Sequence, residues 1–274
     1  METHGLGMTL MKYRQDPDLE FLKDCSSGEL DILVDVLLQS SPPRDDRQSD
    51  SMSVRDYVQA ASSGQRSRGM VQFPDHPLYK EHAPQHTRYW EIIAGEIQRQ
   101  GVNQLALAAR RGLGALYIKI LEHICGLFSV KYLRDSSAEI LERELCAALF
   151  FRSVRHVQRG YLPVLWDAFA LRPEDASIDA FMRNLVETMR LDDGPRHLLA
   201  MCVAHGSAMH AGNIGYKGLA SEKWRVVLEL LEEPLAAELS AVSPVSRTGV
   251  HYWLLIPAVL QVACLRIARN VEQA

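Results

Sequence analysis

Two histidines near the centre of the chain have a spacing that could support metal chemistry. In the stretch "HAPQHTRYWEIIAGEI" (82–97), His82 and His86 lie four residues apart, and imidazoles at this spacing share one face of a helix. A catalytic zinc ion needs a third protein ligand, however, and Glu96 would lie about 15 Å from His86 along the axis. Pro84 favours a helix that begins close to it, with the histidines at its N-terminus. We therefore expect partly exposed imidazoles at a helix start, whose aromatic face packs or docks on another surface.

A cysteine and a histidine further along could form a catalytic pair. In "CVAHGSAMH" (202–210), Cys202 and His205 have the i, i+3 spacing at which a thiolate and an imidazole can meet on a helix. No carboxylate or amide that could orient the imidazole lies nearby in sequence. Because Cys202 stands among apolar residues, a small buried core side chain is the favoured interpretation. A hydrolase that uses a metal or this Cys/His pair is kept as an alternative.

The sequence contains none of the common catalytic signatures. The motifs HExxH, GxSxG, GxGxxG and the phosphate-binding Walker loop are missing, and no histidine has a glutamate three residues before it, as a di-metal helical bundle requires. The stretch "RGLGALY" (111–117) lacks the third glycine of a dinucleotide-binding loop and predicts a turn between helices. We therefore expect no enzyme activity, no cofactor and no metal.

A row of arginines provides a different kind of candidate site. In "FRSVRHVQRG", Arg152, Arg155 and Arg159 fall along one predicted helical stripe, and residues 86–160 hold eleven basic and seven acidic side chains. An anionic surface such as lipid headgroups, RNA or an acidic peptide could dock on this stripe. A solvated helix face is the favoured interpretation, because aromatic residues do not alternate with the charges.

The elements that position these side chains are all predicted to be helices. Residues 16–39 read as a helical hairpin, with Asp16 as the N-cap and Pro17 at the first helical position of its first helix. No alternating pattern of apolar and polar residues predicts a strand. Helical spacing and Gly, Pro or Ser breaks predict further helices at 88–100, 103–111, 114–128, 136–160, 177–190, 195–210, 221–240 and 250–270.

Composition divides the chain into three parts. Residues 40–69 are rich in serine, contain paired prolines and have few large apolar side chains, so they predict a flexible linker. We expect an N-terminal hairpin module at 11–39 and a larger multi-helix domain at 70–274. The fold class is therefore all-α, with a small module, a linker and a main domain.

Length, composition and net charge restrict the class of protein further. The chain has 274 residues, 47% of them hydrophobic, and a net charge of −4, which argues against a dedicated nucleic-acid binder. Five scattered cysteines and no export signal at the start favour a cytoplasmic protein. The apolar stretch at 250–265 is shorter than the roughly 20 residues of a bilayer span, so a buried helix is favoured.

Three stretches together resemble a known family. "YRQDPDLEFLKDCSSGELDILVDVL", "HAPQHTRYWEIIAGEIQ" with "RRGLGALYIKILEHI", and "YWLLIPAVLQVACLR" resemble the bacterial YaaW family, which is commonly grouped with the ubiquinol–cytochrome c chaperones. The resemblance implies a helical, chaperone-like domain, and it carries over no catalytic residues. It carries over a candidate interaction motif: His82, Gln85, His86, Trp90, Ile93, Ala94, Gly95, Glu96, Gly112, Gly114, Leu116, Tyr117, Tyr252, Ile256, Pro257, Ala258 and Gln261.

These observations favour one function over two alternatives, of which the second is the hydrolase named above. We expect a non-enzymatic, chaperone-like interaction protein that holds a helical or membrane-bound protein client. The first alternative is a peripheral protein at the inner membrane, which binds anionic lipid through the basic helices and the terminal apolar helix. Relatives carry a long Gly/Ala-rich apolar stretch before the terminal motif, whereas residues 222–249 are charged and amphipathic here, so no membrane-inserting role is expected from that stretch.

Overall fold

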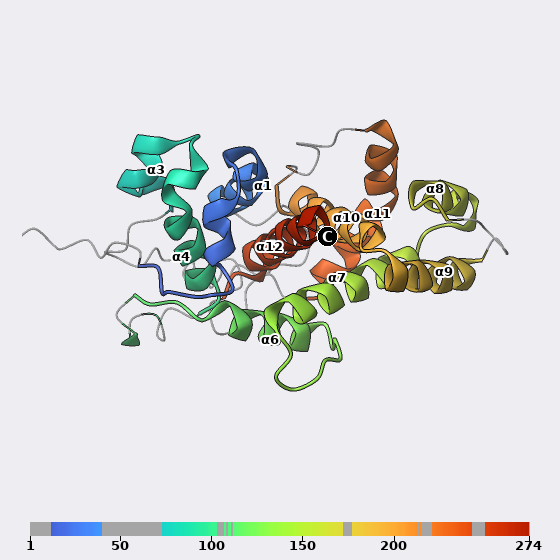
Figure 1. Cartoon of the computed structure of the whole chain (residues 1–274), viewed down its shortest axis with the longest axis horizontal. Coiled ribbons are helices and arrows are strands. Elements are labelled where there is room, and N and C mark those ends of the chain that lie inside the picture. Colours follow the sequence, from blue (N-terminus) through green and yellow to red (C-terminus); the bar gives the residue numbers. More distant parts are fainter. Residues whose placement is uncertain are drawn as a thin grey trace, which may run out of the picture. The chain divides into compact units, whose positions relative to one another are not determined.

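The fold is all-α, as the sequence predicts. A computed structural model of the chain describes residues 12–39, 73–102, 107, 109–110, 112–171, 177–212, 214, 221–242 and 250–273 (Figure 1). In these residues no strand is present, and an isolated parallel bridge joins Lys12 to Leu113. The elements are η1 (Glu20–Asp24), α1 (Ser27–Leu38), η2 (Phe73–Asp75), α3 (Pro77–His82), η3 (His86–Tyr89), α4 (Trp90–Gln100), α6 (Tyr117–Leu127), α7 (Ala138–Val154), η4 (Arg159–Tyr161), α8 (Leu162–Ala168), α9 (Ile178–Leu191), α10 (Gly194–Gly212), α11 (Glu222–Ser240) and α12 (Tyr252–Gln273).

The contacts within the chain define two compact units. The first unit comprises Met1–Ile120 with Pro244–Leu255, and the second comprises Leu121–Ser243 with Ile256–Ala274. The predicted linker at 40–69 lies outside the described residues, as do positions 103–106 of one predicted helix. The division into module, linker and main domain stays a prediction.

The start of the N-terminal segment differs from the expected hairpin. Residues after Asp16 form a turn and then the short 3-10 helix η1, instead of an α-helix capped by Asp16. The reason is that the Asp16 carboxylate is buried and bonds mainly to distant groups, described below. The second helix, α1, forms as predicted, and its N-terminus has a capping box in which Ser26 and Glu29 each accept the other's backbone N–H.

The central helix begins later than Pro84. Helix α3 ends at His82, a turn follows, and α4 starts at Trp90 after the 3-10 helix η3. The predicted apolar face of α4 is confirmed: Ile93, Ala94 and Ile97 are fully buried and Trp90 is half-buried.

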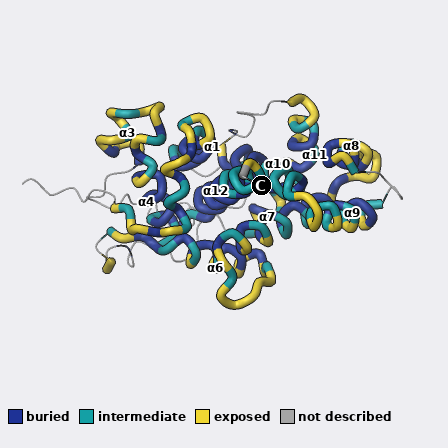
Figure 2. Tube along the Cα trace, viewed as in Figure 1, coloured by how far each residue is buried: buried dark blue, intermediate teal, exposed yellow. Residues whose placement is uncertain are grey.

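The second unit is built around α10, which packs against α7 and α11. Figure 2 shows the buried positions running along α10. Gly206 lies inside α10, where a Cβ atom would stand 2.7 Å from a methyl group of Leu235 on α11. A larger residue at this position would therefore force the Leu235 side chain to shift.

An aromatic cluster in the second unit anchors α9. The ring of Phe181 on α9 packs edge-on against Trp166 of α8 at 5.4 Å and against Phe169 at 5.9 Å. Phe169 also contacts Phe150 of α7 at 5.3 Å. Because edge-to-face aromatic pairs fix ring orientation as well as burying area, α9 is held firmly beside the end of α7.

Helix α12 is long and apolar. Its residues Tyr252–Glu272 have the length and composition of a membrane-crossing helix, but 67% of the most apolar window is buried within the protein. Among the described residues it is the one helix that passes this test. A core helix of a folded protein passes the same test, which agrees with the buried helix predicted for this stretch.

Candidate functional site

The two histidines of the central motif have different partners. His86 is buried, its Nε2 lies 2.9 Å from Oδ1 of Asp31 on α1, and its Nδ1 bonds to the hydroxyl of Tyr89. His82 lies 3.7 Å from the exposed carboxylate of Glu81. The expectation of partly exposed imidazoles is wrong for His86, because α1 packs over η3 and the histidine binds there. In the described part of the chain, no three His, Cys, Asp or Glu side chains come together as metal ligands.

A buried polar network joins the N-terminal segment to α4 and α6. The Oδ2 atom of Asp16 accepts hydrogen bonds from Tyr117 N–H at 2.7 Å and from Nε2 of Gln98 at 3.1 Å. Gln98 also bonds in both directions with the backbone of Arg14, at 2.8 and 2.9 Å. Neither Asp16 nor Gln98 was singled out from the sequence as a site residue, because the groups that they bind lie far away along the chain.

The glycines of the predicted motif allow close backbone approach. A Cβ atom on Gly95 would stand 3.3 Å from the backbone of Tyr13, and one on Gly114 would stand 2.3 Å from the carbonyl carbon of Gln98. Gly112 has a φ of 85°, in the left-handed region that favours glycine. The close approach expected at Gly95 is therefore present, but the neighbour is the extended N-terminal segment and not another helix.

A second buried polar group lies on α4. The carboxylate of Glu96, which is 1% exposed, accepts hydrogen bonds from Arg99, including one of 2.6 Å from Nε, and from Gln100 at 2.6 Å. Burial disfavours the charge of Arg99, but Glu96 outweighs it and raises the pKa of the guanidinium. Burial and the nearby Arg99 lower the pKa of His251, with Glu96 acting in the opposite direction. Glu96 is thus part of an internal ion pair, where a docking partner would not reach it.

The motif residues at the end of the chain are also internal. Tyr252, Pro257 and Gln261 are buried on α12, and Nε2 of Gln261 has no hydrogen-bond partner among the described residues. Gln85, by contrast, is exposed just before η3, and Trp90 packs edge-on against Tyr13 at 5.3 Å. Most of the carried-over motif therefore lies inside the fold, where its side chains hold segments of the chain together.

The Cys202–His205 pair lacks an activated thiol. Both residues are buried on α10, and burial raises the pKa of the Cys202 thiol far above its ordinary value. A nucleophilic cysteine requires the opposite shift, since the thiolate is the reactive form. The surroundings therefore favour the structural interpretation of this cysteine.

The three arginines of the predicted basic stripe lie in different surroundings. Helix α7 ends at Val154, six residues before the expected end, so the stripe does not continue along one helix. Arg152 is half-exposed; it donates to the backbone oxygen of Phe128 at 2.6 Å and lies 3.8 Å from the carboxylate of Glu238 on α11. Arg155 and Arg159 are both exposed, the first at the end of α7 and the second in η4.

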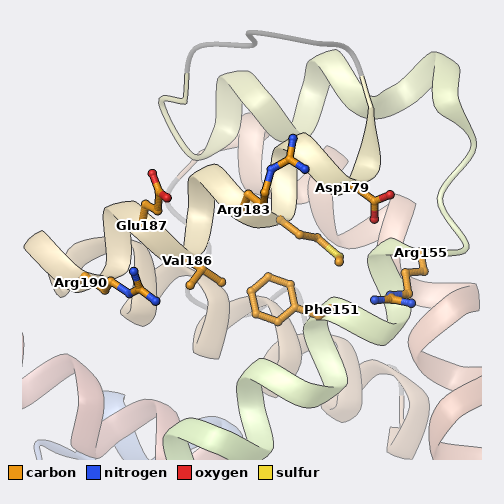
Figure 3. Close-up of a pocket in the computed structure, with 8 residues that line it drawn as sticks. Phe151, Arg155, Asp179, Arg183, Val186, Glu187 and Arg190 are labelled. Carbon is orange, nitrogen blue, oxygen red and sulfur yellow. The ribbon is translucent and has the colours of Figure 1, made fainter.

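Arg155 forms part of an open groove between the end of α7 and α9. The groove has a volume of about 560 Å³, and Figure 3 shows Phe151 and Val186 among the side chains that line it. Its floor consists of the half-buried apolar side chains of Phe151, Val186 and Met182. Its rim is charged and exposed, and comprises Arg155, Asp179, Arg183, Glu187 and Arg190. A sequence search for local motifs misses it, because Phe151 and Val186 come from helices that are adjacent only in the fold.

The arginines of this groove are unpaired. Within the described ranges, the side chains of Arg155, Arg183 and Arg190 make no hydrogen bond or ion pair, whereas those of Arg152 and Arg99 do. A half-exposed apolar floor with free guanidiniums at its rim can bind a partner that offers apolar area and carboxylates or other anions. We therefore take the α7–α9 groove, defined by these eight lining residues, as the candidate functional site.

Comparisons with known proteins agree with the similarity seen in the sequence. Residues 13–39 match a domain of unknown function, DUF3944. The chain is 24% identical over 259 residues to a UPF0174 protein of Helicobacter pylori, and this match covers 94% of this chain and 93% of that protein. It is 26% identical over 258 residues to the UPF0174 protein YaaW of Escherichia coli strain K12, and this match covers 93% of this chain and 96% of that protein. No solved structure matches the chain.

The matched regions include the buried network of the first unit. The DUF3944 match begins at Tyr13 and contains both Asp16 and Asp31, the two N-terminal carboxylates that bind α6 and η3. The grouping with the ubiquinol–cytochrome c chaperones stays a prediction. Over nearly its whole length, the chain is similar to the UPF0174 proteins of which YaaW is one.

Proposed function

We propose that this chain is a non-enzymatic interaction protein that holds a segment of a protein client in the α7–α9 groove. The observation that carries the proposal is the combination of a half-exposed apolar floor, made by Phe151, Met182 and Val186, with three unpaired arginine side chains at its rim. Phenylalanine, methionine and arginine are enriched at protein interfaces, and arginine is one of the residue types that contribute most binding energy there.

The surroundings of the reactive side chains support this choice over an enzyme. His86 uses both ring nitrogens in hydrogen bonds within the fold, and burial raises the pKa of Cys125 and Cys264 to about 12. Such groups suit structural roles better than proton transfer or nucleophilic attack, which need accessible and partly ionised side chains.

The surroundings of α12 also favour a protein client over a membrane surface. Peripheral binding through the terminal helix needs an exposed apolar face, whereas residues 252–264 of α12 are all buried. The α7–α9 groove, by contrast, has an accessible apolar floor on which a protein client can bind. A cytoplasmic location remains our expectation.

Photo-crosslinking in cells tests the proposal. A benzoylphenylalanine placed at Val186 is expected to give a discrete adduct with one protein, because Val186 lies in the groove floor. The double substitution Arg155→Glu and Arg190→Glu should abolish the adduct. Arg159→Glu is the matched control, since Arg159 is also exposed and unpaired but lies outside the groove.

A second probe position separates specific binding from surface adhesion. Leu133 is 82% exposed and lies outside the groove, so a benzoylphenylalanine there should not give the same adduct. Equal adducts from both positions, or an adduct at Val186 that is indifferent to the arginine substitutions, would contradict the proposed function.

A further inference from the structure

We infer that the client segment is an amphipathic helix that carries carboxylates on both sides of an apolar stripe. This inference rests on the proposed function and names the chemistry of the partner. It starts from the way α9 divides its apolar residues between the interior and the groove.

Helix α9 has two apolar faces. Ala180, Phe181 and Leu185 are buried against the rest of the second unit, where Phe181 contacts the aromatic cluster. Met182 and Val186 remain half-exposed, one turn apart, on the side that lines the groove. Two apolar side chains about 6 Å apart along a helix axis match the i, i+4 spacing of side chains on a second helix.

The free arginines set the polar part of the interface. In Figure 3 the guanidiniums of Arg155 and Arg190 flank Phe151 on opposite sides, so the apolar floor has a cation at each end. The planar guanidinium is always charged, and its geometry suits a carboxylate that accepts two hydrogen bonds. A partner with carboxylates on either side of its apolar stripe would pair both arginines.

The acidic side chains of the rim distinguish this partner from a polyanion. Asp179 and Glu187 are exposed on α9 beside the arginines, so the rim carries three positive and two negative groups. A uniformly anionic surface, such as a lipid bilayer or RNA, would bring negative charge against both carboxylates. Spaced carboxylates on a peptide can contact the arginines and avoid Asp179 and Glu187.

The open form of the groove agrees with a chain segment as the occupant. Its lining residues come from the end of α7 and from about three turns of α9, and all of them are exposed or half-exposed. Sites for small molecules usually enclose most of the ligand surface, whereas a helix-binding groove is open along its length. The structure thus points to a helix lying along α9.

Titration with designed peptides tests the inference on the full-length chain. The probe is a fluorescein-labelled helical peptide with a Leu/Phe stripe and glutamates about two turns to either side, and binding is measured by fluorescence anisotropy. We expect it to bind about tenfold more tightly than the same peptide with Glu→Gln, because each charge-assisted pair is worth more than its neutral counterpart. A peptide with Glu→Lys should bind more weakly still.

Protein variants place the effect at the groove. Arg155→Glu with Arg190→Glu should remove the preference for the acidic peptide, and Arg159→Glu should leave its Kd within about twofold. Circular dichroism checks that each variant is folded. Met182→Ser, at a half-exposed position, should weaken the acidic and neutral peptides alike, since it removes apolar area and no charge.

The outcomes separate this inference from the proposed function. Equal binding of the acidic and neutral peptides, or no binding of either, would overturn the acidic-helix inference, while a groove-dependent adduct at Val186 would leave the proposed function standing. Binding of phosphatidylglycerol vesicles that needs the same two arginines, with no peptide preference, would replace the inference with a lipid surface. If the chain with its native arginines gave no adduct from a benzoylphenylalanine at Val186, both would be contradicted.

Discussion

The Asp16 carboxylate accepts a hydrogen bond of 2.7 Å from the backbone N–H of Tyr117, 101 residues further along the chain. Tyr117 is the first residue of α6, where a negative charge is favoured by the helix dipole and by the unpaired N–H groups of the first turn. Because Asp16 also accepts from Gln98, the N-terminal segment is fixed to both α4 and the start of α6. The segment therefore contributes to the stability of the first unit.

Removing the charge of Asp16 should destabilise the protein. The two carboxylate oxygens accept from Asp18, Gln98 and Tyr117, and Asp16→Asn leaves one acceptor oxygen, so we expect a loss of about 1–3 kcal/mol in the free energy of unfolding. Asp24→Asn, at an exposed and unpaired position, is the control and should change it by less than about 0.5 kcal/mol. Urea unfolding measures both; equal effects would show that the network is not needed.

Alanine should have opposite effects on stability at two glycines, one in the loop before α6 and one within α6. A Cβ on Gly114 would overlap the Gln98 backbone at 2.3 Å, so Gly114→Ala should lower the free energy of unfolding by about 1–3 kcal/mol. Gly126 on α6 has open space around its Cβ position, and Gly126→Ala should stabilise the helix by about 0.5–1 kcal/mol. Thermal unfolding of the two variants decides; a harmless Gly114→Ala would contradict the close approach.

The buried ion pair of the second unit should show strong coupling. Glu142 on α7 is fully buried and lies 2.7 Å from Nε of Arg266 on α12. Glu142→Leu or Arg266→Leu alone should lower the free energy of unfolding by about 3–5 kcal/mol, because each removes the direct ionic partner of a buried charge. The double variant should be more stable than the sum of the two losses indicates, and additive losses in a double-mutant cycle would contradict the pairing.

Acid should weaken the first unit through His251. Burial and Arg99 lower its pKa below the usual 6.5 in the folded chain, so the unfolded chain binds the proton more readily. Stability is therefore full above about pH 6.5 and falls as the pH drops from there through the lowered folded pKa. Unfolding free energies measured at several pH values should decrease below this point, and His251→Gln should make the decrease smaller. An unchanged pH dependence in the variant would remove His251 as a contributor.

Local patterns in the sequence predicted the helices well. The apolar spacing of Ile93, Ala94 and Ile97 identified the buried face of α4, and the predicted helices at 177–190 and 221–240 match α9 and α11 within a residue or two. These features depend on side chains within a few turns of one another, which a single sequence displays directly.

Long-range contacts could not be predicted in this way. Asp16 was interpreted as the cap of the helix that follows it, because its own neighbours gave no sign of Tyr117. For the same reason His86 was placed at an exposed helix start, although α1 brings Asp31 to its ring. Arg155 was singled out for its charge, but the apolar floor beside it comes from α9 and becomes visible only when the helices pack.

Hydrogen–deuterium exchange of the full-length chain, alone and with the protein captured at Val186, tests the central claim most directly. The account predicts slower exchange in the complex for the amides of α9 and the last turn of α7, with little change in α1 and α4. Protection confined to the first unit, with α9 unchanged, would contradict the assignment of the α7–α9 groove as the binding site.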